Sequence, residues 1–207
     1  SGETNLVILD DINFSLEEGK SLAITGPSGS GKSTLLGLLA GLDTATSGEI
    51  LLDGIKINLL NEEERAILRK DKVGFVFQSF ELLPSLTALE NVMLPSELKS
   101  ENDPQQRGEY FLDRVGLTDR KNHYPNQLSG GEQQRVAIAR AFACSAKILF
   151  ADEPTGNLDP RNGKLVSDLL FEVNSETDNA LVIVTHDQDL ASQCDKKIEL
   201  KLGKIVD

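Results

Sequence analysis

The sequence lacks any excess of basic residues. Its 21 lysine and arginine residues stand against 33 aspartate and glutamate residues, which gives a formal net charge of -12 at pH 7. Such a chain repels a phosphate backbone, and no run of lysine or arginine offers a compensating basic stripe. Direct binding to nucleic acid is therefore disfavoured.

Long apolar runs and a targeting leader are also missing. No apolar segment reaches the roughly 20 residues that a membrane-spanning helix requires, and no charged-then-apolar stretch with a cleavage site opens the chain. We therefore expect a water-soluble, cytosolic protein. The chain opens with Ser1 and Gly2 rather than with methionine, from which we expect a trimmed N-terminus.

Cysteine is scarce as well. Cys144 and Cys194 form neither a CxxC pair nor a disulfide framework. Both stand in apolar segments of helical character. We expect two buried, reduced thiols.

What the chain does contain is an alternation of strand and helix patterns, within the length of one domain of 207 residues. Alternating apolar residues at Ile12, Phe14 and Leu16 predict antiparallel strands near the N-terminus. Later strands are predicted over 22–25, 48–52, 73–77, 148–151 and 181–185, and helices over 33–40, 61–70, 161–174 and from 187.

The segment 87–144 interrupts this alternation, because it shows helical spacing without strand character. Asn61 with Glu64 and Thr87 with Glu90 predict capping boxes at two helix starts. Loops are marked by Pro95, by Asp103 with Pro104, and by the segment 122–131. The pattern predicts one domain, 1–207, with an α/β core formed by 1–86 and 145–207 and a helical subdomain inserted over 87–144.

A glycine-rich loop follows the first buried strand. It fits the phosphate-loop pattern and consists of Gly26, Pro27, Ser28, Gly29, Ser30, Gly31, Lys32, Ser33 and Thr34. The glycines let backbone N–H groups wrap phosphate oxygens, the helix N-terminus adds the positive end of a dipole, and Lys32 adds a point charge. The Ser33 hydroxyl is the predicted magnesium ligand. A mere surface turn would not place these residues between a buried strand and a helix.

Two carboxylates, Asp152 and Glu153, come directly after the apolar run 148–151. Ligands bind at the carboxyl ends of strands in open parallel sheets. We predict that Asp152 holds magnesium and that Glu153 is the base that polarises the attacking water. Alone, such a pair is more often a helix cap or a solvated turn, but the phosphate loop favours the catalytic interpretation.

A second candidate anion site lies at Ser129, Gly130 and Gly131, where a helix running to about residue 144 begins. Alone, this pattern is a weak signal, because serine commonly caps helices. Together with the phosphate loop, Gln78 after a strand, ILFADEP at 148–154, the segment 156–159 and His186, the motif LSGGEQQR at 128–135 resembles the ABC ATPase family, over essentially the whole chain.

This resemblance implies an α/β fold, the P-loop NTPase fold of ABC ATPases. That fold has a mostly parallel core sheet, an N-terminal antiparallel β subdomain and an inserted helical subdomain. The resemblance also implies Mg²⁺-dependent hydrolysis of ATP, in which water attacks the γ-phosphate in line. Ser129, Gly130 and Gly131 would contact ATP held by the opposite subunit, so that two chains form a homodimer on ATP binding.

Further roles follow from the same resemblance. Gln78 would join the magnesium ion and the attacking water to the helical region, Asp159 would communicate across the dimer, and His186 would contact the γ-phosphate together with Lys32. Taken singly, Gln78 is more often a polar loop residue and His186 a helix-capping or solvated residue. Family members also stack adenine on an aromatic residue of the N-terminal sheet, but no aromatic residue precedes Phe14. Either trimming removed that ring or an aliphatic contact replaces it.

The segments 73–95 and 150–159 resemble one branch of the family, which contains lipoprotein-releasing LolD, macrolide-exporting MacB and, most similar, YbbA-type ATPases. The branch implies an integral membrane permease subunit of the LolCE, MacB or YbbP-like type, and a place on the cytoplasmic side of the bacterial inner membrane. The machine would be a transporter that exports or extracts lipoproteins, lipids, peptides or drugs, or a mechanotransmission complex. The apolar residues Phe80, Leu82, Leu83 and Leu86 would suit a groove for a partner helix, or would equally suit packing of the helical region.

Two other functions stay open at this point. A soluble ABC ATPase of DNA repair, chromosome structure or translation would share the nucleotide chemistry, but a coiled-coil insertion, tandem domains or a basic surface would be expected. A P-loop kinase would transfer phosphate to a small acceptor, and the signature motif argues against it.

Overall fold

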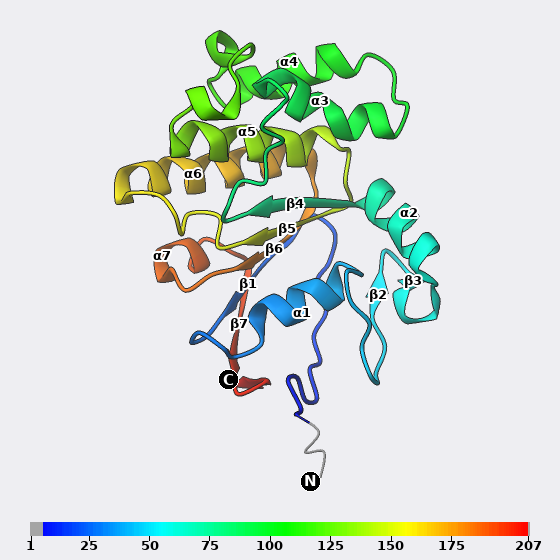
Figure 1. Cartoon of the computed structure of the whole chain (residues 1–207). Helices are drawn as coiled ribbons and strands as arrows, with labels where there is room; N and C mark the ends of the chain where they lie inside the picture. Colours follow the sequence, from blue (N-terminus) through cyan, green and yellow to red (C-terminus); the bar gives the residue numbers. More distant parts are fainter. Residues whose placement is uncertain (1–5, 207) are drawn as a thin grey trace, which may run out of the picture.

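The computed structural model describes residues 6–206 and places a central sheet between two layers of helices (Figure 1). The expectation about Ser1 and Gly2 lies outside the described residues. The strands are β1 (Ser21–Thr25), β2 (Leu51–Leu52), β3 (Ile55–Lys56), β4 (Val73–Phe77), β5 (Ile148–Asp152), β6 (Ala180–Val184), β7 (Lys196–Lys201) and β8 (Lys204–Val206). The α-helices are α1 (Lys32–Leu39), α2 (Glu62–Lys72), α3 (Ala88–Leu98), α4 (Pro104–Arg114), α5 (Gly130–Ala143), α6 (Pro160–Thr177) and α7 (Gln188–Ala191), with short 3-10 turns at η1 (Ile57–Leu59), η2 (Thr118–Arg120) and η3 (Pro125–Gln127).

The main sheet has six strands in the order β4-β5-β6-β1-β7-β8. Five of them run parallel, and β8 joins β7 in the antiparallel direction. This confirms the predicted α/β fold with a mostly parallel core sheet. Because parallel strands end at the same edge of a sheet, the segments that follow β1, β4, β5 and β6 meet at that edge.

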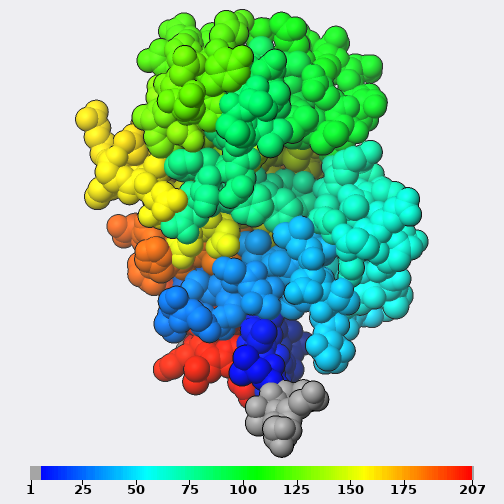
Figure 2. Space-filling view, in the orientation of Figure 1, coloured from blue at the N-terminus to red at the C-terminus, as the bar shows by residue number. Residues whose placement is uncertain are grey.

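Alternating residues of the strands face two different cores. Leu149 and Ala151 belong to the core beneath the helical layer of α3, α4, α5 and α6, whereas Phe150 belongs to the core beneath α1. Figure 1 shows the two layers on opposite faces of the sheet, and in Figure 2 the residues of α3 to α5 (green) form a block well separated from α1 (blue). Both faces of the sheet are therefore covered, as its continuous apolar strands require.

The predicted N-terminal strand over Ile12, Phe14 and Leu16 is wrong, because no strand is formed within residues 6–20. The alternation itself is present, since these three side chains are partly buried against the α1 core while their neighbours are exposed. An alternating pattern indicates which residues face a core. A strand also needs a neighbouring strand with which its backbone forms hydrogen bonds. The antiparallel pair in this region is instead the short hairpin of β2 and β3.

The capping pairs are confirmed, but the prediction that Pro95 marks a loop is wrong. Thr87 and Glu90 form a capping box at the start of α3, as Asn61 and Glu64 do for α2. Pro95 lies inside α3, and its carbonyl accepts a hydrogen bond from the Lys99 N–H at 3.2 Å. Packing of α3 against α4 and α5 outweighs the hydrogen bond that proline cannot donate.

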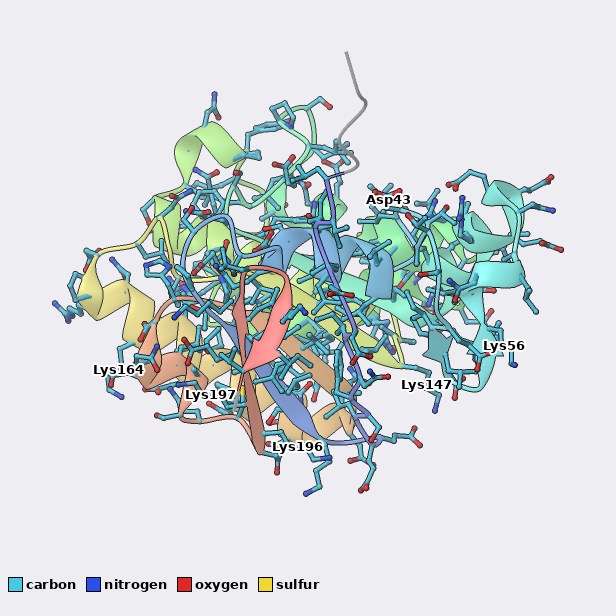
Figure 3. All side chains as sticks on the ribbon, turned by 90° about the horizontal axis from the view of Figure 1, so that it is seen from below. Asp43, Lys56, Lys147, Lys164, Lys196 and Lys197 are labelled. Carbon is cyan, nitrogen blue, oxygen red and sulfur yellow. The ribbon has the colours of Figure 1, made fainter. Side chains whose placement is uncertain are left out.

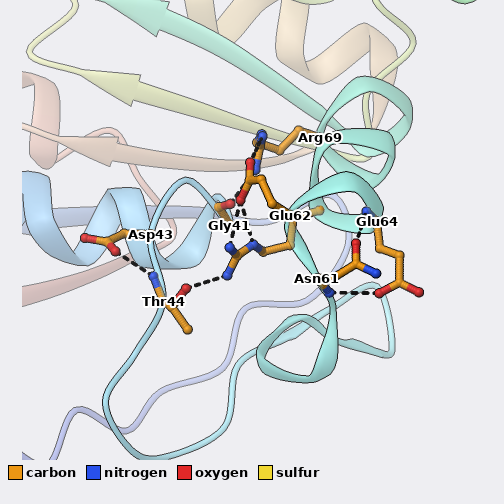
Figure 4. Close-up of polar contacts among 8 residues, drawn as sticks. Gly41, Asp43, Thr44, Asn61, Glu62, Glu64 and Arg69 are labelled. Carbon is orange, nitrogen blue, oxygen red and sulfur yellow. Dashed lines mark hydrogen bonds and ion pairs between the residues drawn. The ribbon is translucent and has the colours of Figure 1, made fainter.

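A cluster of charged side chains joins α2 to the segment that ends α1 (Figure 4). Glu62 accepts hydrogen bonds from Arg65 and Arg69, at 2.7 Å each, and the two arginines lower the pKa of its carboxyl. Arg69 also donates to the Gly41 carbonyl, and Arg65 donates to Thr44, each at 2.5 Å. These bonds fix the far end of the helix that the phosphate loop begins.

The two cysteines are unpaired and differ in burial. Cys144 is buried as expected. Cys194, which follows α7, packs against the core only in part, and this corrects the prediction that both thiols are buried. Burial raises the pKa of both thiols, to about 11 for Cys194. Within residues 6–206, no helix has both the length and the apolar character needed to cross a membrane.

Candidate active site

The phosphate loop takes a backbone path that requires glycine at two positions. Gly26 has φ of 139°, and a Cβ atom there would lie 2.1 Å from the Leu200 carbonyl oxygen. Gly31 has φ of 100° and precedes the first turn of α1, which receives no side-chain cap. Side chains are therefore excluded where the loop passes β7, and the first amides of α1 are available to an anion.

Polar groups inside the loop fit a phosphate ligand. The Lys32 ammonium donates to the carbonyls of Gly26 and Pro27, at 2.9 and 3.0 Å, and so lies folded over the loop. The Ser30 hydroxyl is buried and has no hydrogen-bond partner among residues 6–206. A buried hydroxyl without a partner is costly unless a ligand satisfies it. This donor set suits the oxygens of a nucleotide phosphate.

Asp152 stands at the end of β5, beside the start of α1. Burial raises the pKa of its carboxyl, and a hydrogen bond with Ser33 opposes that shift. The charge of Glu153 raises the pKa further, whereas the charge of Lys32 lowers it. A serine hydroxyl and a carboxylate are oxygen ligands of the kind that Mg²⁺ prefers, so Ser33 and Asp152 fit the predicted metal site.

The Glu153 carboxylate is held on both of its oxygens. Thr185 donates its hydroxyl to Oε2 at 3.1 Å, the His186 backbone N–H donates to the same oxygen at 3.3 Å, and His186 Nδ1 lies 2.9 Å from Oε1. The Glu153 side chain is 17% exposed and that of His186 is 72% exposed. The structure thus brings the two predicted residues together, and it adds Thr185. Sequence reasoning missed Thr185 because only the pairing of β5 with β6 places it here.

Gln78 forms a reciprocal pair with the loop after β5. Its Nε2 donates to Asn157 Oδ1 at 3.0 Å, and Asn157 Nδ2 donates to the Gln78 carbonyl at 2.9 Å. A Cβ at Gly156 would lie 2.8 Å from Gln78 Nε2. Asn157 was predicted only as part of a motif, but it holds Gln78 beside the acidic pair.

The signature residues Ser129, Gly130 and Gly131 lie on the other face of the sheet, at the start of α5. The Glu132 N–H donates to the Ser129 hydroxyl, and Glu132 accepts from the Ser129 N–H, so the two form a capping box. The hydrogen bond from that Ser129 N–H is the main reason why the pKa of Glu132 falls to about 2.

The glycines of this turn have neighbours from the loop after β4 and from α6. A Cβ at Gly130 would contact Phe80 at 3.6 Å, and a Cβ at Gly131 would contact Asn162 at 3.1 Å. Asp159 caps α6 and accepts a bond from Asn162 Nδ2 at 2.5 Å. Asp159 therefore lies near the signature turn, while the phosphate loop precedes a helix on the opposite face.

Comparisons with known proteins agree with this geometry. The family model described as ABC transporter matches residues 9–156. YbbA of Escherichia coli strain K12, described as an uncharacterized ABC transporter ATP-binding protein, is 50% identical over 206 residues, which span 99% of this chain and 90% of YbbA. The lipoprotein-releasing system ATP-binding protein LolD of Treponema denticola is 48% identical over 207 residues, spanning 99% of this chain and 92% of LolD.

A solved structure of the ATP-binding cassette MJ0796, a dimer in a post-hydrolysis state bound to ADP and Pi, superposes with a TM-score of 0.89. It is 44% identical in sequence, and the match covers 100% of this chain and 92% of that one. The fold, the positions of the motifs and the relatives therefore indicate the same family. The chain belongs to the ABC transporter family, as an ATP-binding subunit with ABC-type ATPase activity.

Proposed function

We propose that this chain hydrolyses ATP with the phosphate loop, Asp152, Glu153, Gln78 and His186 in the roles that their motifs predict. The observation that carries the proposal is the Glu153 carboxylate, oriented by Thr185 and His186 at the strand edge where the phosphate loop also lies. From this position Glu153 accepts a proton from the attacking water, and Lys32 and His186 face the developing charge on the γ-phosphate. Ser33, Asp152 and Gln78 would hold magnesium, which would neutralise phosphate charge there.

The proposal includes a homodimer in which each ATP lies between one phosphate loop and the partner's signature turn. Two observations support it. The signature turn and the phosphate loop of one chain lie on opposite faces of the sheet, so they do not form one site within the chain (Figure 1). The similar cassette MJ0796 is a dimer. In such a dimer Ser129, Gly130 and Gly131 complete the partner's site, and Asp159 lies beside them.

Replacing Glu153 with glutamine tests the hydrolytic role. Glu153→Gln keeps the shape and removes the base, so we expect turnover to fall by about 100-fold or more while ATP binding persists and a closed dimer accumulates. The measurements are phosphate release and ATP-dependent dimerisation by size-exclusion chromatography. Glu63→Gln, on the exposed face of α2, is the matched control. Unchanged turnover in Glu153→Gln would remove Glu153 from the role of base.

The membrane partner is the finer part of the proposal: a permease of the LolCE, MacB or YbbP-like type, through which lipoproteins, lipids, peptides or drugs are exported or extracted. The 48% sequence identity to a lipoprotein-releasing LolD supports a permease of this type. The protein would then work at the cytoplasmic side of the bacterial inner membrane. The apolar loop after β4 was predicted either to pack in the core or to dock a partner helix. Leu82 packs against the core, whereas Leu83 is 44% exposed and available for docking.

Docking is tested with Leu83→Glu, compared with Leu98→Glu at the exposed end of α3. Both leucines are exposed, so neither change is expected to lower stability by more than about 0.5 kcal/mol. We expect Leu83→Glu to lose the permease when tagged protein is purified from detergent-solubilised membranes, and Leu98→Glu to retain it. Mass spectrometry of the co-purified chains measures how much permease each variant retains. Equal retention by both variants contradicts docking at this loop.

The soluble alternative has no comparable support. The labelled lysines in Figure 3 project from separate elements, namely Lys56 from β3, Lys147 before β5, Lys164 from α6, and Lys196 and Lys197 from β7. They do not form one basic stripe. The relatives are also ABC transporter and lipoprotein-release proteins.

A further inference from the structure

Gln134 contacts the turn that carries the catalytic base, although it belongs to the signature helix α5. Its side chain is fully buried, with 0% of the residue exposed. Nε2 donates to the Pro154 carbonyl at 2.6 Å, and Pro154 directly follows Glu153. The other amide atom, Oε1, is buried without a hydrogen-bond partner among residues 6–206. Burying Oε1 without a partner is unfavourable, so the bond that Nε2 donates is the one polar contact that this amide makes with the described residues.

The turn that Gln134 contacts is strained. Glu153 has φ of 46°, a left-handed conformation that a non-glycine residue adopts only when its surroundings impose it. Its N–H donates to the Val184 carbonyl at 2.9 Å, and its carbonyl accepts from the Gly156 N–H at 3.0 Å. Pro154 has no N–H to contribute, so the backbone after the base is fixed through its carbonyl, by Gln134.

We propose that Gln134 is a positioning residue that couples the signature helix to the base of its own chain. This rests on the proposed function, in which the N-terminus of α5 contacts the partner's ATP. Three residues after Gly131, on the same helix, Gln134 holds Pro154. A displacement of α5 when the dimer closes therefore moves the turn of Glu153, and each chain adjusts its own base according to whether its signature turn has engaged the partner's nucleotide.

Gln134→Met is the direct test. Methionine fills similar space and removes both the donated bond and the unpartnered acceptor. The Pro154 carbonyl loses its donor, which costs some stability, so thermal unfolding is measured beside turnover. Because Gln134 touches the base turn and not the phosphate loop, kcat should fall by about 10-fold or more while KM for ATP stays within about twofold. Ser96→Ala is the matched control, since Ser96 donates a buried bond of 3.0 Å to the Ala143 carbonyl, at the other end of α5. It should leave kcat unchanged.

Gln134→Glu adds a readout that packing alone would not produce. A protonated carboxyl donates to the Pro154 carbonyl, whereas an ionised carboxylate repels it. Burial raises the pKa of such a carboxyl, so turnover relative to wild type should be lowest at high pH and recover as the pH falls toward 6. A flat ratio across pH 6 to 9 contradicts the proposal, and this holds even if the methionine variant folds poorly.

The remaining control is a combination with Glu153→Gln. If Gln134 acts through the base, Gln134→Met should not further lower the residual rate of Glu153→Gln. Wild-type turnover in Gln134→Met, or a loss matched by Ser96→Ala, overturns the coupling while leaving the proposed function intact. Failure of the wild-type chain to hydrolyse ATP, or of Glu153→Gln to slow it, would instead overturn the proposed function itself.

Discussion

The two helix ends expected to meet at one ATP are built in opposite ways. The N-terminus of α1 follows Gly31, in a left-handed conformation and with no side-chain cap. The N-terminus of α5 follows Ser129, and a capping box with Glu132 satisfies two N–H groups there. The first helix end leaves its amides to a ligand. At the second, the N–H groups of Ser129 and Glu132 are bonded within the chain, whereas those of Gly130 and Gly131 are not part of the capping box. A side-chain cap therefore reduces the number of amides that a helix N-terminus has left for an anion.

Charge separates the two ends as well. Lys32 lies over the loop at the start of α1, next to its carbonyls. At α5 the Glu132 carboxylate already occupies the positive end of the helix dipole, and its pKa is lowered to about 2. We therefore expect the α1 end to contribute more than the α5 end to the binding of phosphate. In the proposed dimer, the α5 end supplies a preformed turn whose Ser129 hydroxyl and two glycines would approach the nucleotide that the partner chain holds.

Mixing variants of the two ends gives the largest expected effect and tests whether they act across the dimer. Lys32→Ala disables the phosphate loop, and Ser129→Arg blocks the signature turn, so each homodimer should lose turnover by on the order of 100-fold or more. A mixture of the two rebuilds one intact composite site per mixed dimer, and measurable phosphate release should return.

The control for this experiment mixes Lys32→Ala with Glu153→Gln. Both changes lie in the same half of a composite site, so every site in the mixed dimer keeps one defect and the mixture should stay inactive. Recovery in this control, or no recovery in the mixture of Lys32→Ala with Ser129→Arg, would mean that the two helix ends do not act in trans.

The cap of α5 gives a smaller effect, which depends on pH. The folded pKa of Glu132, about 2, lies below its ordinary value of 4.5, so its ionised form stabilises the fold. That stabilisation is complete above about pH 5 and is lost as the pH falls toward 2. Glu132→Gln should lower the free energy of unfolding by about 1 kcal/mol at pH 7.

Thermal unfolding of both proteins between pH 7 and pH 3 checks this prediction. The difference in Tm should narrow steadily below pH 5, because the wild-type carboxylate becomes protonated and loses its advantage over the amide. A constant difference down to pH 3 would show that the carboxylate charge does not contribute. ATP affinity of the α1 end should be the same in both proteins.

Local signals were sufficient to predict much of this arrangement. Asn61, Thr87 and Ser129 begin helices because each finds its acidic partner three residues later. The phosphate loop is likewise set by residues close in sequence. In contrast, a strand over 12–16 would have needed a neighbouring strand to pair with. Pro95 stays helical because α3 packs against helices that are distant in sequence. Thr185 contacts Glu153, and Gln134 contacts Pro154, only after β5, β6 and α5 have been brought together. The subdomain boundaries at 86/87 and 144/145 stay a prediction.

The protection of both native thiols makes this protein convenient to label. Cys144 is buried, and the raised pKa of Cys194, about 11, leaves very little thiolate at neutral pH. A cysteine introduced at an exposed position such as Leu165 of α6 should therefore react with a maleimide dye far faster than either native residue. Fluorophores could then report the approach of two subunits in real time, without first replacing the cysteines that the chain already has.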